Sequence, residues 1–287
     1  MKYSMFSGFQ SNIEEYGFDR ALEIAKESGF EGVEFYFSAG YPELIPTPEV
    51  AAEYKRKFDA AGIKVPCVSM GANFIRQREV VALSEGDVQA LFLGLEFAKI
   101  LGAPYFHHTL FMGFIFDIDE SFITKERMKI FYDAARRVAD RARELGITVL
   151  YEPQGSIFNG KERFSALLSE MKKTHKNIGV CCDIANSYWV SEDPYPILNA
   201  CKEDILHVHF KDYLISEGER EGFSKPFFGE LYTKQAPVGA GNIDVPAFAS
   251  LLKSINYSGF ISLEDKVNVK SPEQTRGVIK YCESLFN

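Results

Sequence analysis

The sequence predicts an α/β fold, a single-domain (β/α)8 or TIM barrel over residues 1–287. Short apolar segments alternate with amphipathic segments along the whole chain, a pattern typical of parallel strands joined by helices. Eight such pairs can be counted, the number that closes a barrel. The length of 287 residues also suits a fold that commonly uses about 250.

In the first half of the chain, four predicted helices each end at a glycine, the residue that favours the left-handed conformation of a helix C-cap. A first strand is predicted at residues 2–6. The helices are predicted at 18–28, 48–61, 87–101 and 125–145, and the strands that follow them at 32–36, 64–69, 104–108 and 148–152.

The second half continues the alternation, with strands at 178–183, 204–210 and 260–264 and helices at 161–173, 194–201, 245–254 and 272–285. Two long loops, 71–86 and 213–244, are expected over the active face, as a lid or as a subunit contact. An open doubly wound sheet is the alternative fold. No Gly-x-Gly-x-x-Gly motif follows the first strand, which argues against it.

Composition and charge argue against several classes of protein. The net charge of -8 does not suit a nucleic-acid surface, which needs basic residues to neutralise phosphates. No apolar run approaches the roughly 20 residues that cross a bilayer, and the first residues lack the apolar core of a signal peptide. The five cysteines are an odd number without paired metal spacing, so we expect reduced thiols and a cytoplasmic protein.

Four predicted strands end in a residue that can bind a metal ion: Glu152, Asp183, His209 and Glu264. The carboxyl ends of barrel strands converge on one face, so these side chains are expected to meet. Three carboxylates and one imidazole suit Mn²⁺, Mg²⁺ or Co²⁺, with Zn²⁺ as a further candidate. The alternative is that each acid caps a helix, but clustered carboxylates without a cation would repel one another.

Strand geometry places His207, His209 and Lys211 on one face of their strand. His207 lies deeper than His209 and is expected to be a hydrogen-bonded barrel residue rather than a ligand. For Lys211, contact with a substrate oxygen and a surface salt bridge both stay open.

Five motifs around these residues resemble the xylose-isomerase-like barrel superfamily, with its D-tagatose 3-epimerase-like enzymes and inosose dehydratases. They are Tyr151-Glu152-Pro153, Cys182-Asp183-Ile184-Ala185-Asn186, His207-Val208-His209-Phe210-Lys211-Asp212, Gly239-Ala240-Gly241-Asn242-Ile243-Asp244 and Ser262-Leu263-Glu264. The resemblance implies that Glu152, Asp183, His209 and Glu264 bind one divalent metal ion. It also implies that Glu152 and Glu264 act as acid and base on opposite faces of a bound sugar.

The implied function is a metal-dependent sugar epimerase or isomerase of carbohydrate metabolism, acting by proton abstraction next to a metal-bound carbonyl through an enediolate. An inosose-type dehydratase on the same metal site and a non-catalytic carbohydrate-binding barrel are the alternatives. An abasic-site endonuclease would need more than five histidines and a basic groove. The expected partner is a small-molecule carbohydrate, and the family implies a homodimer or homotetramer.

Three positions depart from the ketose 3-epimerase pattern, namely Asn186, Phe158 and Ile215, where those enzymes place histidine, glutamate and arginine. The usual polar contacts with the terminal hydroxyls of a free ketohexose are therefore missing or rebuilt. Asn186 is expected either to bind a substrate hydroxyl or to cap a helix.

The other substrate-binding candidates are His107, His108, Glu34 and Trp189. His107 and His108 are adjacent and face opposite ways, so one enters the barrel near the substrate, and the sequence leaves open which one. Glu34 contacts substrate or makes a structural hydrogen bond. Trp189 forms an apolar wall for a sugar or packs beneath a loop.

Overall fold

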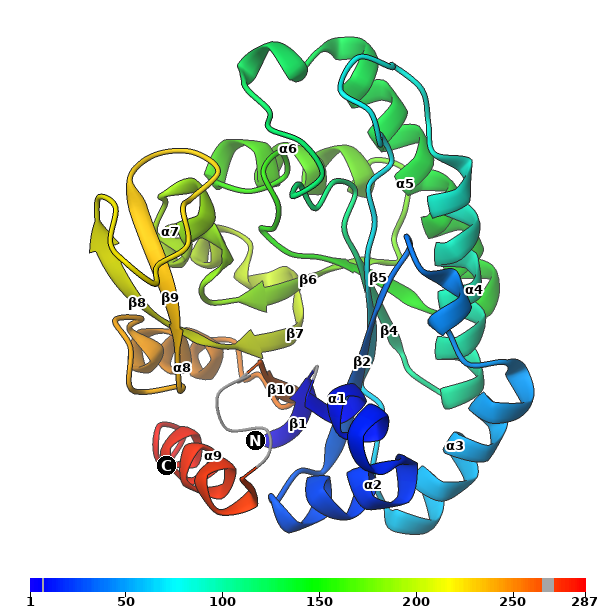
Figure 1. The fold of residues 1–287 in the computed structure, drawn as a ribbon, viewed down its shortest axis with the longest axis vertical. Coiled ribbons are helices and arrows are strands. Elements are labelled where there is room, and N and C mark those ends of the chain that lie inside the picture. Colours follow the sequence, from blue (N-terminus) through cyan, green and yellow to red (C-terminus); the bar gives the residue numbers. More distant parts are fainter. Residues whose placement is uncertain (7, 265–270) are drawn as a thin grey trace.

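The computed structural model describes residues 1–6, 8–264 and 271–287, and they form a closed barrel of eight parallel strands surrounded by helices (Figure 1). The strands follow one another around the barrel in the order β1-β10-β7-β6-β5-β4-β3-β2. They are β1 (Lys2–Phe6), β2 (Gly32–Ser38), β3 (Cys67–Gly71), β4 (Tyr105–His108), β5 (Thr148–Tyr151), β6 (Ile178–Asp183), β7 (Ile205–Phe210) and β10 (Phe260–Leu263). The predicted barrel is confirmed.

The α-helices among the described residues are α1 (Gly8–Tyr16), α2 (Phe18–Glu27), α3 (Pro48–Ala61), α4 (Glu85–Leu101), α5 (Lys125–Leu145), α6 (Lys161–Lys172), α7 (Pro194–Ala200), α8 (Val245–Ser254) and α9 (Pro272–Ser284). Short 3-10 helices are η1 (Pro42–Leu44), η2 (Glu120–Phe122), η3 (Asn186–Val190) and η4 (Lys202–Asp204). Glycines cap α3, α4 and α5 in the left-handed conformation, as predicted. No helix of the described residues combines the length and apolar character needed to cross a bilayer.

Two features differ from the predicted elements. Helix α1 precedes the first predicted helix, and its buried Phe9 packs against Phe18 of α2. The segment predicted as the long loop 213–244 contains an antiparallel hairpin of β8 (Asp212–Glu217) and β9 (Leu231–Ala236). The hairpin stands beside the barrel near α7 and α8 in Figure 1, and β9 contacts η3.

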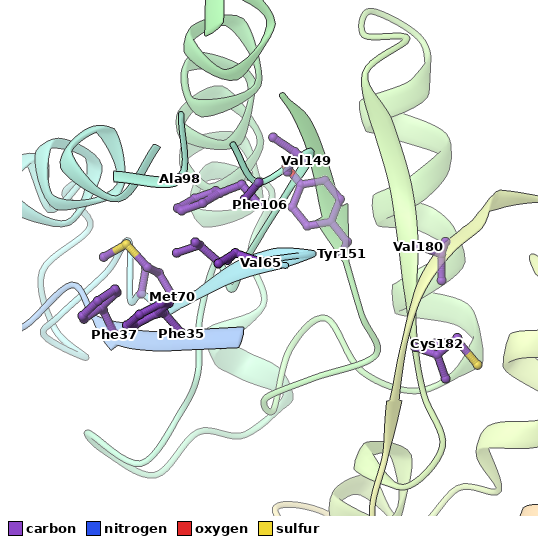
Figure 2. Close-up of a cluster of buried hydrophobic side chains, with 14 of the residues drawn as sticks. Phe35, Phe37, Val65, Met70, Ala98, Phe106, Val149, Tyr151, Val180 and Cys182 are labelled. Carbon is purple, nitrogen blue, oxygen red and sulfur yellow. The ribbon is translucent and has the colours of Figure 1, made fainter. Parts of the chain in front are cut away.

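The barrel strands send apolar side chains outward, and the inward side chains include the polar residues of the site together with a small apolar cluster of Cys67, Leu150 and Cys181. Figure 2 shows the outward set, in which Phe35 and Phe37 of β2 group with Met70 of β3, and Phe106 of β4 lies near Ala98 of α4. These side chains are almost fully buried between strands and helices. Since neighbouring positions on a strand face opposite ways, the intervening residues point into the barrel.

Candidate metal and substrate site

Glu152, Asp183, His209 and Glu264 lie at the carboxyl ends of β5, β6, β7 and β10, which are consecutive in the barrel. The register aligns Asp183 with His209, and His209 with Ser262 of β10. Parallel pairing therefore brings all four strand ends to one mouth of the barrel.

His209 contacts two of the other three residues. Its Nδ1 atom lies 3.2 Å from Glu152 Oε2 and 4.0 Å from Asp183 Oδ2. Ligand atoms of Asp183, His209 and Glu264 all lie within 4.8 Å of one another. Glu152 Oε2 is buried and, in the part of the chain that the structure describes, makes no hydrogen bond. A buried carboxylate oxygen without a hydrogen bond is costly, and a divalent cation among these oxygen and nitrogen atoms would satisfy it.

Lys211 lies among these acids. Its Nζ atom is 2.9 Å from Asp183 Oδ2 and 2.6 Å from Glu264 Oε2. Burial alone would lower the pKa of Lys211, but the Asp183 and Glu264 carboxylates outweigh burial and hold this pKa well above its usual value. Lys211 is 3% exposed, so of its two predicted roles the surface salt bridge is wrong, and the side chain faces the cleft.

The two oxygens of Asp183 have different partners. Oδ1 accepts hydrogen bonds from the backbone N–H groups of Ala185 and Asn186, at 2.9 and 2.7 Å. Oδ2 remains for the Lys211 ion pair. Burial raises the pKa of Asp183 to about 6 despite the nearby ammonium group. The backbone after β6 therefore fixes the orientation of this carboxylate.

The side chain of Asn186 is hydrogen-bonded to Glu152 in this structure. Its Nδ2 group donates a 3.0 Å hydrogen bond to Glu152 Oε1, and it provides no side-chain cap to η3, so the helix-capping alternative is wrong. Burial opposes ionisation of Glu152, but His107 and His209 lower its pKa to about 2. The carboxylate is thus ionised, with Oε1 held by Asn186.

Glu34 is fully buried below this mouth and accepts hydrogen bonds from four side chains: Ser69 at 2.6 Å, Ser262 at 2.5 Å, His207 at 2.8 Å and His209 at 3.1 Å. The structural hydrogen bond, rather than substrate contact, is therefore its role here. His207 is the predicted hydrogen-bonded barrel residue. Burial raises the pKa of Glu34, but the imidazoles of His209 and His207 lower it well below its usual value.

The hydrogen bond from Glu34 also determines how His209 faces the mouth. In the tautomer that donates Nε2–H to Glu34, the Nδ1 atom on the side of Glu152 and Asp183 would be available to bind a metal ion. A carboxylate behind a histidine is the usual arrangement that orients a metal-binding imidazole. Phe6 stacks on the same ring at a centroid distance of 4.8 Å and limits its rotation.

The structure separates the two adjacent histidines. His107 points into the barrel, 3.2 Å from Ser69 Oγ and 3.6 Å from Glu152 Oε1, and lines the cleft. His108 points outward and packs against Tyr151 and Phe106. Burial lowers the pKa of His107, and it lowers the pKa of His108 to about 3. Substrate contact is therefore wrong for His108.

The cleft at this mouth has two adjoining sections. The inner section, of about 130 Å³, is lined by Phe6, Tyr36, His107, Met112, Glu152, Gln154, His209 and Glu264. The outer section, of about 240 Å³, shares Met112, Gln154 and Glu264 and adds Trp189, Asn186, Lys211 and residues of the β8–β9 hairpin. Trp189 thus lines the cleft, as its predicted role as an apolar wall for a sugar requires.

Sequence reasoning missed several of these residues, namely Phe6, Tyr36, Met112, Phe114, Gln154, Tyr213, Phe227 and Gln235. Gln154 and Tyr36 carried a usable signal, because each lies two residues from a chosen residue on the same strand or just beyond it. Burial and the nearby Glu264 and Glu152 raise the pKa of Tyr36 to about 12, so its phenol is protonated at neutral pH.

The glycine-containing segment after the hairpin is occupied by a side chain of the protein. Asp212 Oδ2 accepts the N–H groups of Gly239 and Gly241, each at 2.9 Å, and its Oδ1 accepts that of Ile243 at 3.1 Å. These donors are therefore not free to hold a phosphate. They attach the base of the hairpin to the end of β7.

Comparison with known proteins identifies one matching family and several similar proteins. The family described as "Xylose isomerase-like TIM barrel" matches residues 22–285. An inosose dehydratase of Lacticaseibacillus casei is 24% identical over 182 residues, which are 60% of this chain and 59% of that protein. The chain therefore matches less than two thirds of the length of that curated relative.

Two solved structures are similar over nearly their whole length. A D-allulose 3-epimerase from Methylomonas sp., in complex with D-allulose, has a TM-score of 0.72 and 16% identity, covering 99% of this chain and 96% of its own. The IOLI protein with a binding zinc atom has a TM-score of 0.71 and 19% identity, covering 100% and 98%. At these identities the likeness shows the fold.

Proposed function

Since the chain belongs to the xylose isomerase-like TIM barrel family, we propose that it is a divalent-metal-dependent epimerase or isomerase of a keto sugar. The observation that carries the proposal is the group of Glu152, Asp183, His209 and Glu264 at one mouth, where Glu152 Oε2 is buried 3.2 Å from His209 Nδ1 without a hydrogen bond among the described residues. Mn²⁺, Mg²⁺ and Co²⁺ suit this mainly carboxylate set, and Zn²⁺ also does.

The four residues would hold the ion, and Glu34 would orient His209 toward it. When bound, such an ion supplies Lewis-acid polarisation of a substrate carbonyl. Lys211, 2.6 Å from Glu264 and 2.9 Å from Asp183, places a second positive charge beside the same oxygens. An ammonium group there would favour the negative charge that develops on a substrate oxygen when a neighbouring carbon loses its proton.

Glu152 and Glu264 are the acid and base of the proposed reaction, because both carboxylates line the inner section of the cleft. One removes the proton from the carbon next to the carbonyl, which gives an enediolate. The other returns a proton. Return to the opposite face of the same carbon inverts it. Return to the former carbonyl carbon gives isomerisation when the proton of the neighbouring hydroxyl also passes to the former carbonyl oxygen. Asn186 holds Glu152 in place for this transfer through its hydrogen bond to Oε1.

An inosose-type dehydratase is the second candidate, and the inosose dehydratase relative specifically favours it. The same proton abstraction followed by loss of a β-hydroxyl would give dehydration. A non-catalytic carbohydrate-binding barrel would need neither carboxylate as an acid or base. The homodimer or homotetramer and the cytoplasmic location stay predictions.

The test is incubation of the Mn²⁺-loaded protein with ketoses and inososes in D₂O, followed by NMR and mass spectrometry. Deuterium at the carbon next to the carbonyl without loss of water supports the epimerase or isomerase. An unsaturated product supports the dehydratase. Sugar binding without exchange, unchanged in Glu152→Gln and Glu264→Gln, would contradict both enzymes and leave the binding protein.

A further inference from the structure

The outer section of the cleft differs in chemistry from the inner section. The inner section contains the acids and imidazoles. The outer section is the larger, at about 240 Å³ against about 130 Å³. Three aromatic side chains form one wall of it, and polar side chains such as Thr233 and Gln235 share the lining. Aromatic rings with a few polar groups beside them are typical of a site that binds a small molecule.

Three segments far apart in the sequence supply the rings of this wall. Phe114 follows β4, Trp189 lies in η3, and Phe227 lies between β8 and β9. Their ring centroids are 4.9 Å apart for Phe114 and Phe227, 5.8 Å for Phe114 and Trp189, and 5.9 Å for Trp189 and Phe227. A 2.7 Å hydrogen bond from the Phe227 N–H to the Trp189 carbonyl holds the hairpin to η3.

The backbone is strained where it presents Phe114. This residue has φ of 59°, a conformation that costs a bulky L-residue energy, and yet its side chain is 66% exposed. The preceding Gly113 has φ of 83°, and a Cβ atom there would lie 2.9 Å from the Phe227 ring. An exposed ring held by an unfavourable backbone conformation is expected where the ring contacts a ligand.

Gln154 marks the junction of the two sections, since it lines both. Its Oε1 atom is buried and has no hydrogen-bond partner in the part of the chain that the structure describes. A substrate hydroxyl at the junction would donate to this oxygen. The cleft thus combines an acidic end, one unsatisfied acceptor in the middle and a wall of flat rings at the other end.

We propose that the substrate is a cyclic keto sugar that carries a second ring through a glycosidic bond. This inference rests on the proposed function. The ring with the carbonyl lies in the inner section, and the second ring lies against Trp189 and Phe227. A glycosidic bond blocks the anomeric carbon, so the carbonyl of such a substrate is at another ring carbon.

The chain offers a direct probe, because Trp189 is its one tryptophan. Fluorescence excited selectively in tryptophan, and not in the fourteen tyrosines, therefore reports on the outer section. The Mn²⁺-loaded protein is titrated with methyl β-D-glucopyranoside, phenyl β-D-glucopyranoside and methyl β-cellobioside, and calorimetry measures the same affinities. The phenyl and cellobiose arms distinguish an aryl ring from a second sugar ring.

We expect at least one of the two-ring ligands to change Trp189 fluorescence and to bind about tenfold more tightly than the methyl glucoside, the size of one aromatic contact plus its buried area. Phe227→Ala should remove this preference and leave binding of the methyl glucoside unchanged, which also shows that the variant is folded. Phe228→Ala is the matched control, because that ring lies over the Arg163 guanidinium outside this wall.

Equal affinity for one-ring and two-ring ligands, no binding of any of them, or a ring preference that survives Phe227→Ala would overturn the proposal. Deuterium exchange into keto sugars is measured separately. Ring preference with no exchange of any keto sugar contradicts the proposed function and not the ring site. Exchange of keto sugars without ring preference contradicts the ring site alone.

Discussion

Two layers of polar side chains lie inside the same barrel, but they differ in how many hydrogen bonds they make. In the lower layer, Glu34 accepts hydrogen bonds from Ser69, Ser262, His207 and His209. In the upper layer, Glu152 Oε2 lies beside a cavity with His209 Nδ1 at 3.2 Å and no hydrogen bond among the described residues. Burial of a carboxylate alone therefore does not distinguish the two layers, whereas hydrogen bonding and access to the cavity do.

The largest effect should come from the upper layer. Glu152→Gln keeps the shape of the side chain and removes the acid-base group, so we expect the rate of deuterium exchange from D₂O to fall by about 10³-fold. Because Glu152 Oε2 makes no hydrogen bond, the melting temperature should change little. Exchange kinetics and thermal melts of the same preparation check both parts. An exchange rate close to that of the wild type would show that Glu152 is neither the acid nor the base of the reaction.

The lower layer should respond in the opposite way, through stability and metal affinity. Glu34→Gln leaves His207 and His209 without their buried counter-charge, which we expect to cost about 3 kcal/mol of unfolding free energy. Loss of the group that orients His209 should also weaken metal binding by about 10–100-fold. Denaturant unfolding and metal titration measure these effects.

Ser69→Ala is the matched control for Glu34→Gln. It removes one of the hydrogen bonds that Glu34 accepts and should cost only about 1 kcal/mol, with the metal affinity nearly intact. If Glu34→Gln has the same unfolding free energy and the same metal affinity as the wild type, the role given to the lower layer is wrong.

His108 belongs to neither layer, because it points out of the barrel. Its ring packs against the Tyr151 ring, and its Nε2 atom is buried without a hydrogen bond to any described residue. Its folded pKa of about 3 lies below the ordinary value of 6.5, so as the pH falls the unfolded chain takes up a proton that the folded chain does not. Stability should therefore decrease below pH 6.5, by about 2 kcal/mol at pH 5 from this residue. His108→Phe should flatten that part of the pH dependence of unfolding, and an unchanged slope would contradict the assignment.

The upper layer could be predicted from the sequence because it depends on strand ends. Once the chain is a barrel, the last residue of each strand lies at one mouth, so Glu152, Asp183, His209 and Glu264 needed no knowledge of side-chain packing. Strand alternation likewise placed His207, His209 and Lys211 on one face. For Glu34 the sequence left substrate contact and a structural hydrogen bond open, and it could not choose between them because one partner, Ser262, is 228 positions away.

Features that depend on register or on loop packing could not be predicted. Alternation required one of His107 and His108 to enter the barrel, but only the pairing of β4 with β3 and β5 determines which. The β8–β9 hairpin was missed because its strands lie inside one long connection. The position of Phe227 follows from that hairpin, so the aromatic wall required the three-dimensional structure.

The central claim is that four strand ends bind one divalent ion, and a Mn²⁺ titration followed by calorimetry and electron paramagnetic resonance tests it most directly. We expect the wild type to bind one ion per chain and His209→Asn to bind none. His207→Asn should still bind one ion, because the His207 imidazole belongs to the lower layer. A wild-type chain that binds no ion, or a His209→Asn variant that binds it as the wild type does, would contradict the account.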